Sequence, residues 1–160
     1  MAGPRLVFEM ELSLGSTAEL VLGTLTAFEN DAPVFTLSAT SGKAGHQYRE
    51  SNGEPHVWEP DYSPLPPGHY AVETVKRDTS AALLAKMGPF NFRVLPDEVV
   101  VSGKGRRFDL RVHFDGPAGE PRDGTEGCIG CRPFDAQFFN WIEKWRRQGY
   151  WAVPLEVQYS

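Results

Sequence analysis

The sequence predicts a mainly β domain, a β-sandwich or barrel with one main helix and one minor helix. Apolar and polar residues alternate in about seven short runs, as they do in half-buried strands. The 16 Gly and 13 Pro supply turns between these short elements. A strong helical stripe occurs in one segment alone. The length of 160 residues suits one compact domain, residues 1–160, rather than two.

The first half of the chain predicts three strands and one long connection. Residues 6–12 alternate and favour an opening strand. Residues 19–27 and 33–40 flank a Phe-Glu-Asn-Asp segment at 28–31, and Asn and Asp favour a hairpin turn there. Residues 41–68 are polar, rich in Gly, Pro, Asn and His, and longer than an ordinary connection. We therefore expect this long segment to be a mobile binding loop or lid beside the functional site.

The second half predicts the remaining strands and both helices. Strands are expected at residues 69–76, 91–95, 99–102, 106–114 and 151–159. Residues 79–87 form an Ala- and Leu-rich run that begins at Thr or Ser and ends at Gly88, which favours a short helix. Residues 134–147 carry aromatic and aliphatic residues at helical spacing. We expect this main helix to pack on the sheet through Phe138, Ile142 and Trp145.

Charge and hydropathy exclude two classes of partner. The net charge is −5, and the basic runs at 104–107 and 146–147 are short, whereas nucleic-acid binding depends on clustered Lys and Arg. No run approaches the length of apolar sequence that a membrane span needs. Residues 1–14 alternate charged and apolar residues, unlike a secretion signal. We therefore expect neither nucleic acid as a partner nor a membrane span.

Residues 113–131 hold a candidate nucleophile and its base. His113 ends a predicted strand, and Thr-Glu-Gly-Cys-Ile-Gly follows at 125–130. A thiolate attacks an amide carbonyl, while an imidazole removes the thiol proton and later protonates the leaving amine. A position directly ahead of a helix would lower the pKa of Cys128, and Gly127 would let main-chain N–H groups approach an oxyanion. A buried core cysteine and an ordinary strand histidine would fit the same spacing.

Two blocks of sequence resemble the YkuD-type L,D-transpeptidases. That family has a strand His followed by Ser/Thr-x-Gly-Cys and an aliphatic residue, which His113 and residues 125–129 match. The family also has a Ser-Thr-Gly-Lys-like strand end and then Thr-Pro-x-Gly-x-Phe/Tyr. Here Ser-Gly-Lys at 41–43 precedes Ser-Pro-Leu-Pro-Pro-Gly-His-Tyr at 63–70, and the resemblance covers residues 33–131.

The chain departs from the family pattern at three positions. Phe114 replaces the Gly that follows the His, Glu126 replaces a His, and Gly130 replaces an Arg or Asn. Arg132 is a candidate for the missing cation. The pattern is most similar to a divergent branch that includes toxins exported by type VI secretion systems.

The resemblance implies a YkuD-like fold and a cysteine enzyme without cofactor or metal. Such an enzyme acts on L,D peptide bonds in the tetrapeptide stems of peptidoglycan through a thioacyl-enzyme, which water, an amine or a D-amino acid then resolves. Cys128 would be the nucleophile and His113 the base, with the Phe114 carbonyl orienting the imidazole. The expected oxyanion and substrate residues are Gly127, Thr125, Tyr70, Gly68 and Ser41.

The same resemblance implies a place of action and a set of partners. We expect a monomer that acts in the periplasm, the cell envelope or the extracellular space and reaches it without a recognisable signal peptide. Peptidoglycan stem peptides are the expected partners. A secretion machine and an immunity protein are further candidates.

Three alternatives remain at the level of the sequence. The domain could bind peptidoglycan without catalysis, since the Arg or Asn after the cysteine is missing. Cys128 and Cys131 could act as a redox pair or close a reversible disulfide on oxidation, although the redox motif expects a βαβ setting. His46, His56 and His69 suggest zinc, but structural zinc favours two closely spaced pairs of ligands, and the chain has one Cys-x-x-Cys. We therefore expect no metal site.

Overall fold

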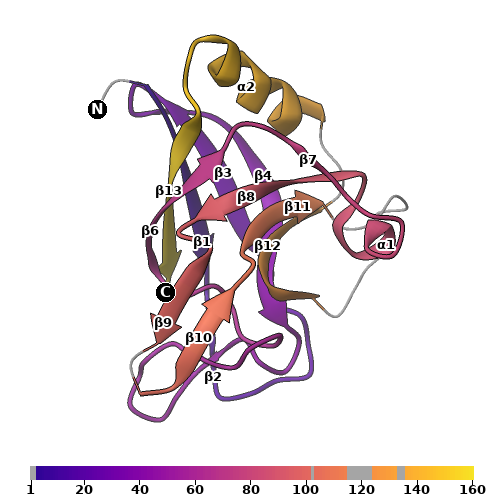
Figure 1. Cartoon of the computed structure of the whole chain (residues 1–160). Helices are drawn as coiled ribbons and strands as arrows, with labels where there is room; N and C mark the ends of the chain where they lie inside the picture. The colour runs from indigo at the N-terminus through magenta and orange to yellow at the C-terminus, as the bar shows by residue number, and fades with distance from the viewer. Residues whose placement is uncertain (1–2, 102, 115–123, 133–135) are drawn as a thin grey trace.

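Eight strands close into a barrel in the part of the chain that the structure describes (Figure 1). This computed structural model describes residues 3–101, 103–114, 124–132 and 136–160. The order around the ring is β11, β12, β4, β3, β1, β13, β6 and β8, and β8 pairs with β11 to close it. The strands are β1 (Pro4–Met10), β3 (Gly23–Glu29), β4 (Ala32–Lys43), β6 (Gly68–Glu73), β8 (Phe90–Leu95), β11 (Arg111–Phe114), β12 (Gly124–Arg132) and β13 (Ala152–Tyr159). The predicted mainly β class is confirmed.

Smaller elements surround the barrel. The main helix α2 (Ala136–Arg147) lies across one end, and a separate hairpin of β9 (Glu98–Val101) and β10 (Gly105–Phe108) lies toward the other (Figure 1). The short strand β7 (Arg77–Asp78) pairs with the outside of β8, and the short strands β2 (Ser13–Leu14) and β5 (Tyr48–Arg49) pair with each other. The minor helix α1 (Leu84–Met87) is one turn long.

Local sequence explains the first hairpin and the closure of the ring. Asn30 and Asp31 both have positive φ, 51° and 66°, as a tight turn between twisted antiparallel strands requires. The strands that they join, β3 and β4, form the predicted hairpin, but β3 runs from Gly23 to Glu29 and not over residues 19–27. At the other side of the barrel, the first strand β1 pairs in parallel with the last strand β13.

Alternating side chains fill the barrel, and helix α2 covers its end. Phe8, Leu25 and Phe92 are fully buried inside it. Helix α2 adds Phe138, whose ring meets that of Phe92 edge-on at 5.8 Å between centroids. The predicted packing face of α2 is confirmed, because its buried residues are Phe138, Trp141, Ile142 and Trp145. The predicted first residue of the helical stripe, Phe134, lies outside the described residues.

Two predicted elements differ from the structure. Residues 106–114 do not form one strand, because Asp109 adopts φ 58° and this left-handed turn separates β10 from β11. The helix predicted at 79–87 shrinks to Leu84–Met87, and no side chain caps its N-terminus. Its predicted end at Gly88 is correct, since Gly88 has φ 71°.

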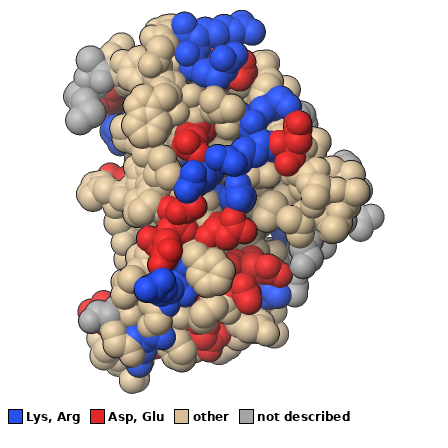
Figure 2. Space-filling view, viewed as in Figure 1, with Lys and Arg blue, Asp and Glu red and all other residues tan. Residues whose placement is uncertain are grey.

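Charge is mixed on the face that Figure 2 shows. Lys and Arg side chains lie among Asp and Glu there. None of the helices in the described ranges is long and apolar enough to cross a membrane.

Candidate active site

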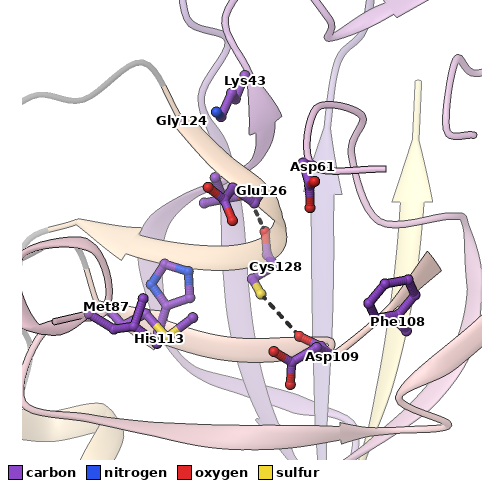
Figure 3. A pocket seen from close by; sticks show the side chains of 11 residues that line it. Lys43, Asp61, Met87, Phe108, Asp109, His113, Gly124, Glu126 and Cys128 are labelled. Carbon is purple, nitrogen blue, oxygen red and sulfur yellow. Dashed lines mark hydrogen bonds between the residues drawn. The ribbon is translucent and has the colours of Figure 1, made fainter. Parts of the chain in front are cut away.

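A pocket of about 190 Å³ brings the candidate nucleophile and base together (Figure 3). Strand β11 contributes His113, and β12 contributes Cys128. The other walls come from the end of β4, the long segment 41–68, the region of α1 and the turn after β10. The lining residues are Lys43, Asp61, Leu83, Met87, Phe108, Asp109, His113, Gly124, Thr125, Glu126 and Cys128.

Strand pairing explains why the two side chains face the same pocket. Strands β11 and β12 run parallel, and His113 lies opposite Gly130. Cys128 comes two residues before Gly130, so the period of two places it on the same face as His113. Residues that are 15 apart in the sequence, 113 and 128, thus lie on neighbouring strands. Their shared lining of one pocket agrees with the prediction of a cysteine with a nearby histidine.

The next residue along β11 orients the imidazole. His113 Nδ1 lies 3.3 Å from the main-chain oxygen of Phe114, the contact that the sequence resemblance implied. A proton on Nδ1 that is donated to this oxygen leaves the lone pair on Nε2, which can accept a proton from a thiol. The Phe114 ring itself is fully buried in the core.

Cys128 is carried by a bulge in β12. Gly124 pairs with Lys43 and Ile129 pairs with Ser41, so five steps along β12 match two along β4, an excess of three residues. Extra residues in one strand of a pair bend it and redirect its side chains. Thr125 holds this bulge: its hydroxyl donates to Cys128 O at 2.6 Å and accepts from Gly42 N at 2.9 Å. Thr125 therefore supports the cysteine as well as lining the pocket.

Gly127 lets a buried cation approach the bulge. Gly127 has φ 110°, and a Cβ at this position would overlap the guanidinium of Arg107. Its N–H donates to the Thr125 hydroxyl at 3.3 Å. Gly127 thus gives space and a left-handed backbone conformation, and its role beside an oxyanion stays a prediction.

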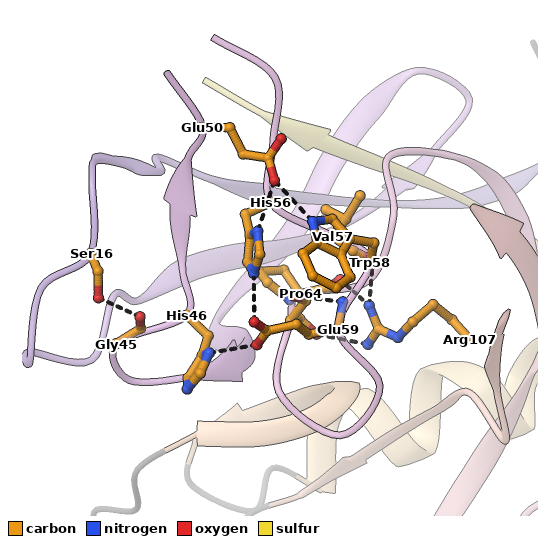
Figure 4. Close-up of polar contacts among 11 residues, drawn as sticks. Ser16, Gly45, His46, Glu50, His56, Val57, Trp58, Glu59, Pro64 and Arg107 are labelled. Carbon is orange, nitrogen blue, oxygen red and sulfur yellow. Dashed lines mark hydrogen bonds and ion pairs between the residues drawn. The ribbon is translucent and has the colours of Figure 1, made fainter. Parts of the chain in front are cut away.

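Arg107 is a buried cation that the sequence interpretation missed. It is 2% exposed and donates to three main-chain oxygens, those of Val57 at 2.6 Å, Ser63 at 2.7 Å and Pro64 at 3.0 Å (Figure 4). No carboxylate among the described residues forms an ion pair with it. Burial lowers the pKa of Arg107 from its ordinary value, and nearby Tyr159 and Cys128 oppose this shift.

The resting thiol of Cys128 is protonated. Burial raises the pKa of Cys128 to about 11, and the thiol lies 3.7 Å from Asp109 O as its donor. The expectation that a helix dipole lowers this pKa is wrong, because Cys128 lies within β12 and the described part of α2 begins eight residues later, at Ala136. The thiol therefore needs a base such as His113 to release its proton.

Three predicted substrate residues lie away from the pocket. Ser41 is fully buried, accepts a hydrogen bond from Leu65 N at 2.8 Å and lies 3.4 Å from Gly127 O, so it supports the bulge from behind. Tyr70 faces the core and donates to Pro66 O at 2.7 Å; burial raises its pKa to about 12. Gly68 begins β6 and pairs with Val157. None of the three lines the pocket.

The long segment 41–68 forms a wall of the pocket, and its predicted mobility stays a prediction. Lys43 and Asp61 do line the pocket, as expected for a segment beside the site. Buried Gln47 ties the segment to its surroundings, since its side chain donates to Ser41 O at 2.9 Å and accepts from Val21 N at 2.7 Å. Arg107 holds the same segment at three further oxygens. These contacts anchor the wall to the barrel.

The two cysteines lie on opposite faces of β12. Cys131 is fully buried in the barrel core and Cys128 faces the pocket. Three residues of extended strand separate their Cα atoms by about 10 Å, beyond the 4.4–6.8 Å of a disulfide. A disulfide between Cys128 and Cys131 would therefore require β12 to leave its extended conformation.

The arrangement defines a small β-barrel domain whose pocket carries a cysteine beside a histidine, and comparisons with known proteins add little. No family model matches the chain, and no curated protein does. A solved structure of Bd1075 from Bdellovibrio bacteriovorus is similar at 15% sequence identity and a TM-score of 0.49. That match covers 96% of this chain and 48% of Bd1075, so the chain spans about half the length of that protein. No functional conclusion is drawn from so distant a likeness.

Proposed function

We propose that the domain is a cysteine acyltransferase of the L,D-transpeptidase type that cuts L,D peptide bonds in peptidoglycan tetrapeptide stems. The observation that carries this proposal is the convergence of Cys128 and His113 on one pocket from neighbouring strands. The sequence blocks that resemble the YkuD-type enzymes supply the substrate class.

The proposed reaction begins with Cys128 as a thiol and His113 as a neutral imidazole. His113 takes the proton of the Cys128 thiol as the sulfur attacks the carbonyl carbon, which gives a tetrahedral oxyanion. Collapse of this intermediate breaks the C–N bond, and the imidazolium returns the proton to the departing amine. Water, an amine of another stem or a free D-amino acid then attacks the thioester and regenerates the thiol.

The polar lining of the pocket suits a substrate that carries both a positive and a negative group. Lys43 offers one cation, while Asp61, Asp109 and Glu126 offer carboxylates. A stem peptide carries terminal carboxylate and amine groups that these side chains can pair with. Buried Arg107 lies against Gly127, where its charge favours a thiolate on the adjacent residue. We assign Arg107 a positioning and electrostatic role through the bulge.

The substrate class suggests where the protein works. Action on stems requires access to the cell envelope, and delivery by a secretion machine with an immunity protein in the producing cell would suit the toxin-like sequence pattern. The domain is proposed to act as a monomer, since the pocket lies within one chain.

Mass spectrometry of purified muropeptides tests the proposal. Wild-type protein should release one D-amino acid from a tetrapeptide stem, exchange it or form a cross-link, and each product has its own mass. Cys128→Ala should abolish all three at unchanged fold, because no thioacyl-enzyme can form. The matched control Cys131→Ala changes a cysteine on the opposite face and should retain turnover. Full turnover by Cys128→Ala would contradict the proposal, and sacculus binding without turnover by wild type would favour a binding module.

A further inference from the structure

A second cluster of chemically active side chains lies in the long segment 41–68 (Figure 4). His46, His56 and Glu59 place one potential ligand atom each within 4.8 Å of one another. None of the three lines the pocket of Cys128. The third histidine noted in the sequence, His69, is in β6 opposite Glu156 and takes no part.

The His56 ring is held in one orientation by its neighbours. Its side chain is 3% exposed, and the ring stacks on Tyr48 at 4.4 Å between centroids with 13° between planes. Nδ1 lies 3.1 Å from Glu50 Oε1, which also accepts from Trp58 Nε1 at 2.9 Å. A histidine that binds a metal commonly donates its other ring N–H to a carboxylate in this way. The contact to Glu50 leaves the lone pair on Nε2.

The lone pair of His56 faces a carboxylate without a hydrogen bond. Nε2 is buried and has no hydrogen-bond partner among the described residues, and Glu59 Oε1 lies 3.4 Å away but out of line. A lone pair and a carboxylate oxygen repel each other unless a cation or proton lies between them. Two donors that each lie about 2.0–2.1 Å from a tetrahedral Zn²⁺ are about 3.3–3.4 Å apart. The separation of His56 Nε2 and Glu59 Oε1 matches this geometry, whereas the 2.8 Å between His46 Nδ1 and Glu59 Oε2 is a direct hydrogen bond that an ion would replace.

His46 is the third potential ligand of the cluster and lies on its solvent-exposed side. Its Nδ1 lies 2.8 Å from the other oxygen of Glu59, and its ring packs against Tyr62 at 4.8 Å between centroids. The side chains of His46 and Glu59 are 34% and 29% exposed, so an ion can enter and a water can fill a fourth position. Two imidazoles and one carboxylate form a donor set typical of divalent transition metals.

We propose that His46, His56 and Glu59 bind one divalent transition-metal ion, with Glu50 orienting His56. The ion would tie residues 46 and 56–59 together and so stiffen the wall that carries Asp61 into the pocket. The inference does not rest on the proposed function, since none of these residues takes part in the acyl transfer. It differs from the expectation that the chain has no metal site.

Cobalt spectroscopy tests this site, because Co²⁺ reports coordination number and sulfur ligation. Wild-type protein titrated with Co²⁺ should show the visible absorption of one four-coordinate ion without a sulfur charge-transfer band, and Zn²⁺ should displace it. Cys128→Ala should give the same spectrum. His46→Gln and Glu59→Gln should lose it, and Glu50→Gln should weaken binding about 10–100-fold. His69→Gln is the matched control and should bind as the wild type does.

Thermal unfolding gives a second readout that does not depend on colour. Zn²⁺ at about 100 times its Kd should raise the melting temperature of wild type by about 5–10 °C. His46→Gln changes a side chain that is about one-third exposed, so this variant should fold without metal and show no such rise. Absence of a cobalt spectrum in wild type would overturn the proposal. A spectrum that survives in both His46→Gln and Glu59→Gln, or disappears in Cys128→Ala, would overturn it too.

Discussion

Cys128 and Arg107 are two of the buried ionisable residues at the candidate active site. A thiol that is buried stays protonated, and a guanidinium that is buried keeps its charge because its intrinsic pKa is very high. Arg107 donates its hydrogen bonds to three main-chain carbonyl oxygens of residues 57–64. Because these oxygens carry no full charge, the guanidinium of Arg107 remains a positive charge beside Gly127 that can stabilise a thiolate on Cys128. Cys128 needs a base to lose its proton.

The first residue-scale prediction concerns the pH dependence of Cys128. The thiolate is the reactive form, and a pKa of about 11 leaves a small fraction of it at neutral pH. Alkylation of Cys128 by iodoacetamide, followed by peptide mass spectrometry, should rise about tenfold per pH unit between pH 7 and pH 10. A rate that levels off near pH 7 would mean that His113 already holds the proton in the free protein, contrary to the prediction.

The second residue-scale prediction concerns Arg107. Arg107→Met leaves three buried carbonyl oxygens without donors and should lower the free energy of unfolding by about 2–4 kcal/mol in urea titrations. The neighbouring Arg106 is the matched control: its side chain is 68% exposed, and Arg106→Met should change stability by less than about 0.5 kcal/mol. Alkylation of Cys128 should also slow in Arg107→Met, because the thiolate loses a nearby cation. Equal alkylation rates would limit Arg107 to a structural role.

At the scale of elements, the bulge in β12 shapes the backbone around Cys128. A regular strand would pair with β4 throughout, whereas three extra residues interrupt this pairing between Gly124 and Ile129, where Cys128 lies. Thr125 closes the bulge with its hydroxyl, Gly127 provides the left-handed turn, and Ser41 supports the bulge from β4. The family-like Ser/Thr-x-Gly-Cys pattern thus has a conformational cause in this fold.

Removal of the Thr125 hydroxyl tests the closure of the bulge. Thr125→Val keeps the shape of the side chain but leaves Gly42 N and Cys128 O without their buried partner, which should cost about 1–3 kcal/mol of stability. Thr125→Ser retains the hydroxyl and should lie close to wild type. Thermal unfolding and the alkylation rate of Cys128 should both distinguish the two variants. If Val and Ser behave alike, the hydroxyl does not organise the bulge.

At the scale of the whole molecule, the closed barrel and helix α2 share one core. Aromatic side chains from α2 continue the packing of the barrel interior, as the contact of Phe138 with Phe92 shows. Two side chains of α2 also contact β3, where Glu29 accepts from Trp141 Nε1 at 2.9 Å and from Lys144 Nζ at 2.7 Å. The hydrogen bond from Lys144 lowers the pKa of Glu29 from its ordinary value. The helix is therefore part of the barrel and not an appendage.

Truncation of the helix anchor tests this shared core. Phe138→Ala removes a fully buried ring and should lower the free energy of unfolding by about 3–5 kcal/mol. Trp151→Ala removes a larger ring that is 69% exposed and should change stability by less than about 0.5 kcal/mol. Urea unfolding monitored by circular dichroism checks both. A small effect of Phe138→Ala would show that α2 contributes little to the stability of the barrel.

The sequence by itself determined what depends on neighbouring residues. Period-two alternation located most strands, Asn30 and Asp31 located the first hairpin, and a helical stripe located α2, because these signals act over a few residues. The motif blocks selected Cys128 and His113, which do share a pocket. Asp109 broke the predicted strand because a single left-handed residue leaves the hydrophobic pattern unchanged.

Only the tertiary structure decided the environment of each chemical group. Arg107 lies among oxygens contributed some 43–50 positions away, so its burial left no local signal. Burial raises the pKa of Cys128, and Cys128 is buried within β12 because that strand pairs with β4 and β11. Ser41 and Tyr70 turned inward, and His46 and His56 met Glu59, for the same reason. Desolvation and the grouping of side chains depend on the distances between segments, which barrel closure alone establishes.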